Sequence, residues 1–258
     1  MITIKYRGRF GNNLIQYAAA VILAKKHGLK LETKPYSRYS NRGIYKTTSS
    51  NKNYIEINFG PTFNLQEIDG KIYENVIELN DKNFLKYLKE HNEQQGFLLN
   101  GFFQTSELLC DYREDILELY KPPETDFKPN KNDAFIACRL GDCLVTKRKY
   151  CSIEYIENQI KKNISSYDNV YITSDTIDHP QLQNIIKRYG LIICEKPVVD
   201  TMLFASKFNN LILSAGSFSY WMAYFSKAEN ITVYKCNNHD PIQKNNAWSY
   251  NNNIKFES

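Results

Sequence analysis

The feature that most constrains the fold is an alternation of strand-like and helix-like segments in the second half of the chain. Short apolar runs at 134–138, 170–173, 191–194, 211–213 and 231–234 are separated by segments with helical spacing of apolar residues. Such alternation indicates βαβ units, which build parallel sheets covered by helices. It predicts an α/β domain.

Helix start and stop signals support this interpretation. Ser152 is a suitable N-cap for a helix over 153–164, because its hydroxyl can accept a backbone N–H of the first turn. Pro180 can begin the next helix, and Gly190 can end it in a left-handed conformation.

A similar unit begins the chain. Residues 2–6 alternate like a half-buried strand, Gly8 and Gly11 follow, and apolar residues recur at helical spacing over 14–27, where Gly28 can end the helix. The next strand is expected at 29–33, which completes a β–glycine turn–α–β unit. The turn would place helix N-terminal N–H groups at the carboxyl edge of the sheet, where an anion can bind.

Two glycines in a tight turn explain that segment without a ligand. They explain less well why the amides of Asn12, Asn13 and Gln16 cluster at the start of the helix. Both interpretations stay open from the residues alone.

The first half ends in a strand, a helix and a linker. An apolar strand leads to Gln104, and Thr105 or Ser106 can cap a single helix that runs through Leu108, Tyr112, Ile116 and Leu119. Residues 124–132 are polar, which is typical of an interdomain linker. We therefore expect two α/β domains, residues 1–128 and 129–258.

Polar or glycine-containing turns follow three strands of the second domain. They are Arg139 to Asp142, Ser174-Asp175, and Ser214 to Ser219. Because the carboxyl ends of parallel strands meet at one edge of a sheet, these groups would lie close together. A cation, carboxylates, hydroxyls and a helix start suit a nucleoside diphosphate, although each turn alone needs no ligand.

Charge and cysteine content bear on the partners. The net charge is +5, but Lys and Arg are interleaved with Asp and Glu. Without a basic block, we expect no nucleic-acid partner, and a mildly basic cleft suits a phosphorylated small molecule. The six cysteines form no Cys-x-x-Cys pair and the four histidines do not cluster with them, so we expect no metal site.

The N-terminus lacks a signal-peptide pattern, and no apolar run approaches the length of a membrane span. Several cysteines lie in apolar strand-like runs, where cysteine behaves as a small hydrophobe. We therefore expect a cytoplasmic protein in a reducing compartment, with no transmembrane segment.

Five short segments match a known set of motifs in the same order. Residues 7–18 read RGRFGNNLIQYA, similar to a GGLGNQMFQYA-like opening, and residues 101–107 read GFFQTSE, similar to GYWQSE with one extra residue. Residues 137–142, 174–175 and 215–221 read ACRLGD, SD and AGSFSYW, similar to H-x-R-R-G-D, a Ser-Asp after a strand, and NSTFSWW. The set resembles that of the α-1,2-fucosyltransferases of glycosyltransferase family 11.

This resemblance implies two Rossmann-like domains facing a cleft, the glycosyltransferase B architecture. The C-terminal domain would bind GDP-fucose as donor, and the N-terminal domain would face a glycan acceptor. Transfer would invert the anomeric centre without a metal or other cofactor. A bidentate Arg and a helix N-terminus can stabilise the departing diphosphate in place of a metal.

The resemblance also implies roles for individual residues. Arg139 would bind the diphosphate, and Asp142 is a candidate for orienting Arg139, binding nucleotide or acting as base. The expected substrate-binding residues are Gly11, Asn12, Gln104, Asp175, Ser217, Phe218 and Ser219. For Asn12 and Gln104, helix capping and turn bonding remain the alternative.

The chain departs from the family motifs beside Arg139. Ala137 replaces the family His, Leu140 replaces the second Arg, and Ala215-Gly216 replaces Asn-Ser. Two alternatives therefore stay open: another nucleotide-sugar donor, or a catalytically silent protein that binds a nucleotide or carbohydrate. A nucleotide-binding oxidoreductase is disfavoured, because neither domain has G-x-G-x-x-G at its first turn.

Overall fold

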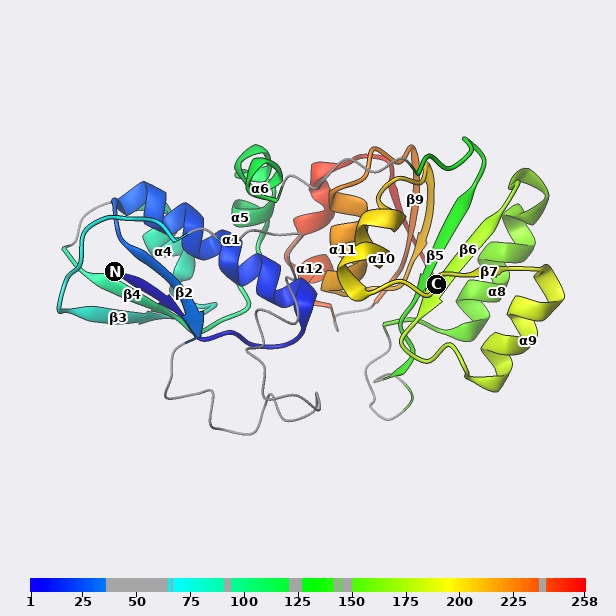
Figure 1. The fold of residues 1–258 in the computed structure, drawn as a ribbon, viewed down its shortest axis with the longest axis horizontal. Helices are drawn as coiled ribbons and strands as arrows, with labels where there is room; N and C mark the ends of the chain where they lie inside the picture. Colours follow the sequence, from blue (N-terminus) through cyan, green and yellow to red (C-terminus); the bar gives the residue numbers. More distant parts are fainter. Residues whose placement is uncertain are drawn as a thin grey trace. The chain divides into compact units, whose positions relative to one another are not determined.

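The computed structural model describes residues 1–35, 65, 67–90, 94–120, 127–141, 144, 150–236 and 240–258. It divides into two compact units, Met1–Pro123 and Glu124–Ser258, shown as ribbons in Figure 1. The division falls at the start of the segment predicted as a linker, shortly before the expected boundary at 128/129. Each unit contains a parallel sheet with helices, as the strand–helix alternation predicts.

Unit 1 is built on a four-stranded parallel sheet of order β2-β1-β4-β3. Its strands are β1 (Ile2–Ile4), β2 (Leu31–Pro35), β3 (Val76–Leu79) and β4 (Gly96–Leu99). Strands β1 and β4 are neighbours at the centre of this sheet, so the segments that follow their carboxyl ends lie close together.

The main helix of unit 1 is α1 (Phe10–His27), which joins β1 to β2. Most of its length is buried, and Gly28 ends it at φ 62°, as the sequence predicts. The helix begins earlier than the expected Leu14. Gly11 and Asn12 therefore lie in its first turn and not in a preceding loop.

Three shorter helices complete the described part of unit 1. They are α4 (Phe84–Lys89), α5 (Ser106–Leu109) and α6 (Arg113–Leu119). Of the two predicted caps, Thr105 is the one that caps α5, by accepting a hydrogen bond from Leu108 N at 3.3 Å. The single long helix expected after Thr105 is wrong, because α5 and α6 are separate.

Gln16 of α1 ties the end of β1 to the end of β4. Its side chain is fully buried. Oε1 accepts hydrogen bonds from Arg7 N (3.0 Å) and Asn13 Nδ2 (3.2 Å), and Nε2 donates to the carbonyls of Arg7 (3.2 Å) and Gly101 (2.9 Å). The amides that cluster at the start of the helix therefore brace the unit internally.

Gln16→Leu is expected to lower the free energy of unfolding by about 2–3 kcal/mol, because the Arg7 N–H and the Gly101 carbonyl lose a buried partner. Denaturant unfolding followed by circular dichroism measures this change, since both tryptophans lie in unit 2. Gln181→Leu, at an exposed helical position, is the matched control and should change stability by no more than about 0.5 kcal/mol. Equal effects of the two substitutions would contradict the bracing role.

Unit 2 is built on a six-stranded parallel sheet of order β10-β9-β8-β5-β6-β7. The strands are β5 (Ala134–Cys138), β6 (Val170–Ser174), β7 (Ile192–Ile193), β8 (Asn210–Leu213), β9 (Asn230–Tyr234) and β10 (Ile254–Glu257). The chain starts at β5, extends the sheet outwards through β6 and β7, then returns to β8 and extends the other side. This is the doubly wound, Rossmann-like order.

The helices of unit 2 cover both faces of the sheet. Those in the described residues are α8 (Ile153–Asn163), α9 (Pro180–Tyr189), α10 (Val198–Ala205), α11 (Ser217–Tyr224) and the short α12 (Pro241–Lys244). Figure 1 shows α8 and α9 on one face, and α10 and α11 on the other. The predicted caps are confirmed: Ser152 accepts from Tyr155 N at 3.0 Å, and Gly190 has φ 64°.

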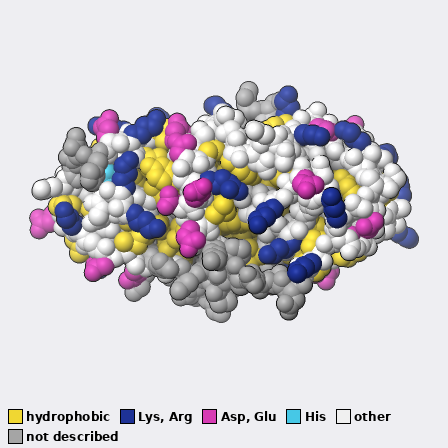
Figure 2. Space-filling view, turned by 90° about the horizontal axis from the view of Figure 1, so that it is seen from above, with side chains coloured by type: hydrophobic (Ala, Val, Ile, Leu, Met, Phe, Trp, Pro, Cys, Tyr) yellow, Lys and Arg dark blue, Asp and Glu magenta, His cyan; other side chains and the backbone are white. Residues whose placement is uncertain are grey.

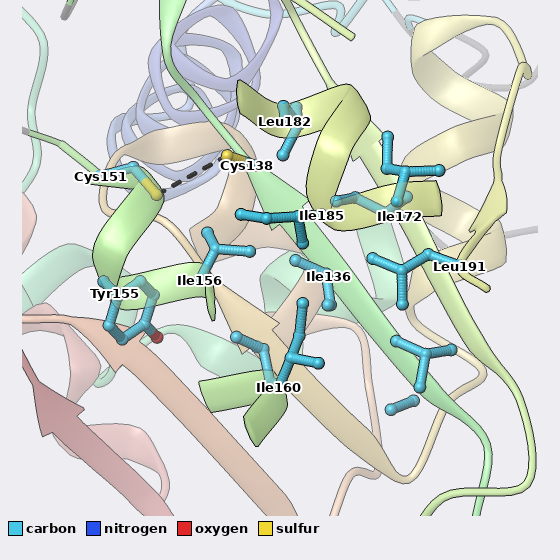
Figure 3. Packing of buried hydrophobic residues seen from close by; sticks show 14 of the residues in the cluster. Ile136, Cys138, Cys151, Tyr155, Ile156, Ile160, Ile172, Leu182, Ile185 and Leu191 are labelled. Atoms are coloured by element: carbon cyan, nitrogen blue, oxygen red, sulfur yellow. Dashed lines mark hydrogen bonds between the residues drawn. The ribbon is translucent and has the colours of Figure 1, made fainter. Parts of the chain in front are cut away.

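Strand β5 is buried on both faces, because its alternate side chains pack against different helices. Ile136 lies among the apolar side chains of α8 and α9, including Ile156 and Ile185 (Figure 3). On the other face, Phe135 packs edge-on against Phe204, with ring centroids 6.0 Å apart. The alternation anchors β5 at the centre of the unit.

Cys138 ends β5 inside the cluster of Figure 3, where its sulfur lies 3.9 Å from that of Cys151. Both cysteines are buried, and neither is in a disulfide. They behave here as small apolar side chains, as expected for cysteines in strand-like runs.

The surface carries charges of both signs. Figure 2 shows Lys and Arg side chains interspersed with Asp and Glu over the face that it draws. Among the described residues, no helix combines the length and the apolar character needed to cross a bilayer.

Candidate functional site

The switch point of unit 2 lies between β5 and β8, where open α/β sheets bind ligands at the carboxyl ends of the strands. Arg139 follows β5, and Ser214 to Gly216 follow β8. The two strands pair in register, with Ala137 opposite Leu213, so their ends are adjacent. Asp175 follows β6, the neighbour of β5 on its other side. The three strand ends predicted to carry the site therefore lie on adjacent strands.

Arg139 is placed by an aromatic ring and by a glycine. Its guanidinium carbon lies 4.2 Å from the centroid of the Tyr150 ring, a cation–π arrangement. A Cβ added to Gly216 would lie 2.7 Å from Arg139 Nη1, so a larger residue there would displace the guanidinium from this position. The Tyr150 carbonyl accepts a hydrogen bond from Ala215 N at 2.7 Å. This bond joins the backbone at Tyr150 to the turn that contains Gly216.

Helix α11 begins directly after Gly216, whose φ of 107° and ψ of 164° are accessible in practice only to glycine. The first turn of any helix presents N–H groups without intrahelical acceptors and the positive end of the dipole. Three predicted residues, Ser217, Phe218 and Ser219, form this turn. Ser219 is buried, with its Oγ 3.0 Å from Ser214 Oγ, whereas the other two are partly exposed.

Asp240 belongs to the same site, although the sequence analysis missed it. It is only 2% exposed, and its carboxylate accepts hydrogen bonds from Gly216 N and Ile242 N, each at 3.1 Å. Burial raises its pKa from 3.8 to about 6, against the lowering effects of those two N–H groups and of Arg139. The Asp240-Pro241 pair is a helix-start signal and could have indicated the cap of α12, but not the bond to Gly216.

Asp175 supports the backbone that follows Arg139. Its Oδ1 accepts hydrogen bonds from Leu140 N at 2.8 Å and Gly141 N at 2.9 Å. A Cβ on Gly141 would lie 2.9 Å from Asp175 Oδ2, so this approach also favours glycine. Asp142, the other carboxylate expected here, lies outside the described residues.

The residues predicted in unit 1 follow its two central strands, β1 and β4. Gln104 Nε2 donates to Asn12 Oδ1 at 2.8 Å, which links the segment after β4 to the first turn of α1. Gly8, at φ 73°, makes room for Asn12, because a Cβ there would lie 2.1 Å from Asn12 Nδ2. Gly11 is buried beside Asn12 in the same helical turn.

The switch point of unit 2 presents the groups that bind an anion. Arg139 supplies a cation, the start of α11 supplies N–H groups, and Gly216 lets the two lie side by side. Within the described ranges, no group of three or more His, Cys, Asp or Glu residues is placed to hold a metal ion. An arginine beside a helix N-terminus can bind a diphosphate and stabilise the negative charge that develops on it.

The chain also matches a known protein family over nearly its whole length. The family described as Glycosyl transferase family 11 matches residues 1–255 of the 258. No curated protein matches the chain significantly. The family match spans both units and every motif segment identified in the sequence. The chain therefore belongs to glycosyl transferase family 11.

Proposed function

We propose that the protein transfers fucose from GDP-fucose to a hydroxyl of a glycan acceptor, with inversion at the anomeric carbon and without a metal ion. Family membership makes it a glycosyltransferase, which uses a nucleotide-sugar donor and a glycan acceptor. The choice of GDP and fucose rests on the motif resemblance. The structural observation that supports a diphosphate donor is the Arg139 guanidinium beside the start of α11 at Gly216.

In this proposal Arg139 and the first turn of α11 bind the donor diphosphate. As the bond between the sugar carbon and the β-phosphate oxygen breaks, negative charge grows on the departing GDP. A guanidinium and helix N–H groups that already point at this charge stabilise it more than water could. They supply the positive charge that a metal ion supplies elsewhere, which supports transfer without one.

The acceptor hydroxyl attacks the anomeric carbon from the face opposite the diphosphate, so the configuration inverts. The hydroxyl loses its proton to a base, for which Asp142 remains our candidate beside its alternative roles of orienting Arg139 or binding nucleotide. The proposed nucleotide contacts come from Asp175, Ser217, Phe218 and Ser219. The proposed acceptor side, which completes the B architecture, comes from Gly11, Asn12 and Gln104.

A second candidate function is binding of a nucleotide or carbohydrate without transfer. Two positions favour it, because Ala137 and Leu140 stand where the family motif has His and Arg, and each is only 3% exposed. Neither side chain can donate a hydrogen bond to a phosphate. Arg139 is therefore the positively charged residue that this part of the motif retains.

Incubation with GDP-fucose and an array of glycan acceptors is expected to give products heavier by one deoxyhexose. Mass spectrometry identifies the gain, and NMR of the product gives its anomeric configuration, which should be opposite to that of the donor. The yield should not change with a chelator present. A hexose-sized gain with another donor would refute fucose, whereas tight GDP binding without any product would support the second candidate.

A further inference from the structure

A buried carboxyl group is bonded to the turn that starts α11. Asp240 accepts a hydrogen bond from Gly216 N at 3.1 Å, and the next residues along the chain are those of the first turn, proposed to bind the diphosphate. The Arg139 guanidinium lies against the same glycine, because a Cβ added to Gly216 would lie 2.7 Å from Arg139 Nη1. One glycine thus separates a buried acid from the proposed phosphate ligands.

The ionisation of this carboxyl group depends on opposing effects. Burial favours the neutral acid, whereas the N–H groups of Gly216 and Ile242 and the charge of Arg139 favour the carboxylate. Of the charged side chains in the described ranges, Arg139 is the one that acts on Asp240. The resulting pKa of about 6 means that a nearby change of charge can alter the protonation state close to neutral pH.

We propose that Asp240 is a positioning residue that takes up a proton from solvent when a nucleoside diphosphate binds, so that donor binding is coupled to protonation of a buried carboxyl group. This inference rests on the proposed donor site. A diphosphate at Arg139 and the start of α11 brings negative charge close to Asp240 and cancels part of the Arg139 charge. Both changes favour the neutral acid. The protonated carboxyl can still accept from Gly216 N through one oxygen, so the turn keeps its shape.

The direction of the pH dependence follows from proton linkage. In the free protein the Asp240 carboxyl has a pKa of about 6. The bound diphosphate raises that pKa further. The complex then holds more protons than the free protein, so binding strengthens as the pH falls. The affinity should change by up to about tenfold per pH unit between the free and the bound pKa, and level off below the free value.

The test is isothermal titration calorimetry with GDP at pH 7.5, in buffers that differ in ionisation enthalpy. The wild type should take up more protons per GDP than Asp240→Asn, by at most one, because the neutral side chain of the variant mimics the protonated acid. That variant should bind GDP at least as tightly as the wild type at pH 7.5 and lose the part of the pH dependence that comes from Asp240. The terminal phosphate of GDP itself titrates near pH 6, but this contribution is common to both proteins and cancels.

Asp133→Asn is the matched control. Asp133 is also a buried carboxylate of unit 2, 3% exposed, and it accepts backbone hydrogen bonds from Asn130 N at 2.8 Å and Asn169 N at 3.1 Å. It precedes β5, so it lies at the opposite end of that strand from Arg139. Its substitution should leave the proton uptake and its pH dependence as in the wild type.

Equal proton uptake by the wild type and Asp240→Asn would overturn the inference and leave the proposed function standing. Weaker binding by that variant at every pH would also overturn it, because a purely structural role has that effect. A folded wild type that does not bind GDP would overturn the proposed function and the inference with it. If Asp240→Asn does not fold, the wild type is titrated with GDP-fucose, whose esterified phosphates do not titrate near neutral pH. Absence of proton uptake then overturns the inference, and uptake supports it.

Discussion

Replacing Arg139 with alanine is expected to lower the turnover number for fucosyl transfer about a thousandfold, the effect of removing a principal stabiliser of developing charge. The guanidinium would lie against the diphosphate that must leave with the bonding electrons. The family's neighbouring Arg is Leu140 here, which is buried and uncharged, so it cannot take over this role. Steady-state kinetics with GDP-fucose measures the loss.

The same substitution should leave the fold intact. Arg139 is partly exposed and follows the buried residues of β5, so its truncation removes little from the core. We expect the free energy of unfolding to fall by no more than about 1 kcal/mol. Arg139→Lys keeps the charge but loses the planar fork that binds two phosphate oxygens, and it should have intermediate activity.

Arg188→Ala is the matched control for Arg139→Ala. Arg188 lies on α9 and forms an ion pair with Glu157, with Nη1 2.7 Å from Oε1. Its side chain is 60% exposed, so its removal should leave the kinetics unchanged. Turnover of Arg139→Ala within tenfold of the wild type would contradict the assignment of the diphosphate ligand.

Local signals in the sequence predicted helix ends well. Ser152 and Thr105 cap helices through their own hydroxyls, and Gly28 and Gly190 end helices at positive φ. These features depend on a few neighbouring residues, so they can be identified before any tertiary contact is known. The strand–helix alternation likewise predicted parallel sheets, but not the order of the strands, which long-range packing determines.

Strand β10 shows why part of the fold could not be predicted. Its sequence, IKFE, has no buried residue and lies at the edge of the sheet, so it lacks an apolar run. Contacts from α8 hold it in place: Gln159 Nε2 donates to Glu257 Oε2 at 2.7 Å, and Lys162 Nζ lies 3.0 Å from the same oxygen. These partners are far away in sequence, and no local pattern reveals them.

Part of the candidate site could likewise be predicted from the sequence, and part could not. The strand ends led to Arg139 and Asp175, because parallel strands bring their carboxyl ends to one edge. Tyr150 and Asp240 could not be found in this manner, since their roles depend on a ring lying under a guanidinium and on a carboxylate reaching Gly216. The hydrogen bonds from Asp175 to the backbone after Arg139 were also not predicted.

Substitution of Gly216 is also expected to reduce activity strongly. Gly216→Ala should lower kcat/KM for the donor about a hundredfold, because an alanine Cβ would lie 2.7 Å from Arg139 Nη1 and push the guanidinium off the Tyr150 ring. The backbone cost adds to this, since a φ of 107° with a ψ of 164° strains any residue other than glycine by about 1–3 kcal/mol. The variant should therefore lose both stability and activity.

Gly190→Ala separates these two losses. Gly190 also has a positive φ, 64°, but a Cβ there would meet nothing within 4 Å. It should therefore lower the melting temperature through backbone strain and leave kcat/KM unchanged. Comparing the two variants by calorimetry and by donor kinetics isolates the contact with Arg139. If Gly216→Ala loses stability but keeps its kcat/KM, then the exact placement of the guanidinium does not matter for transfer, and Arg139 cannot be the ligand that stabilises the departing diphosphate.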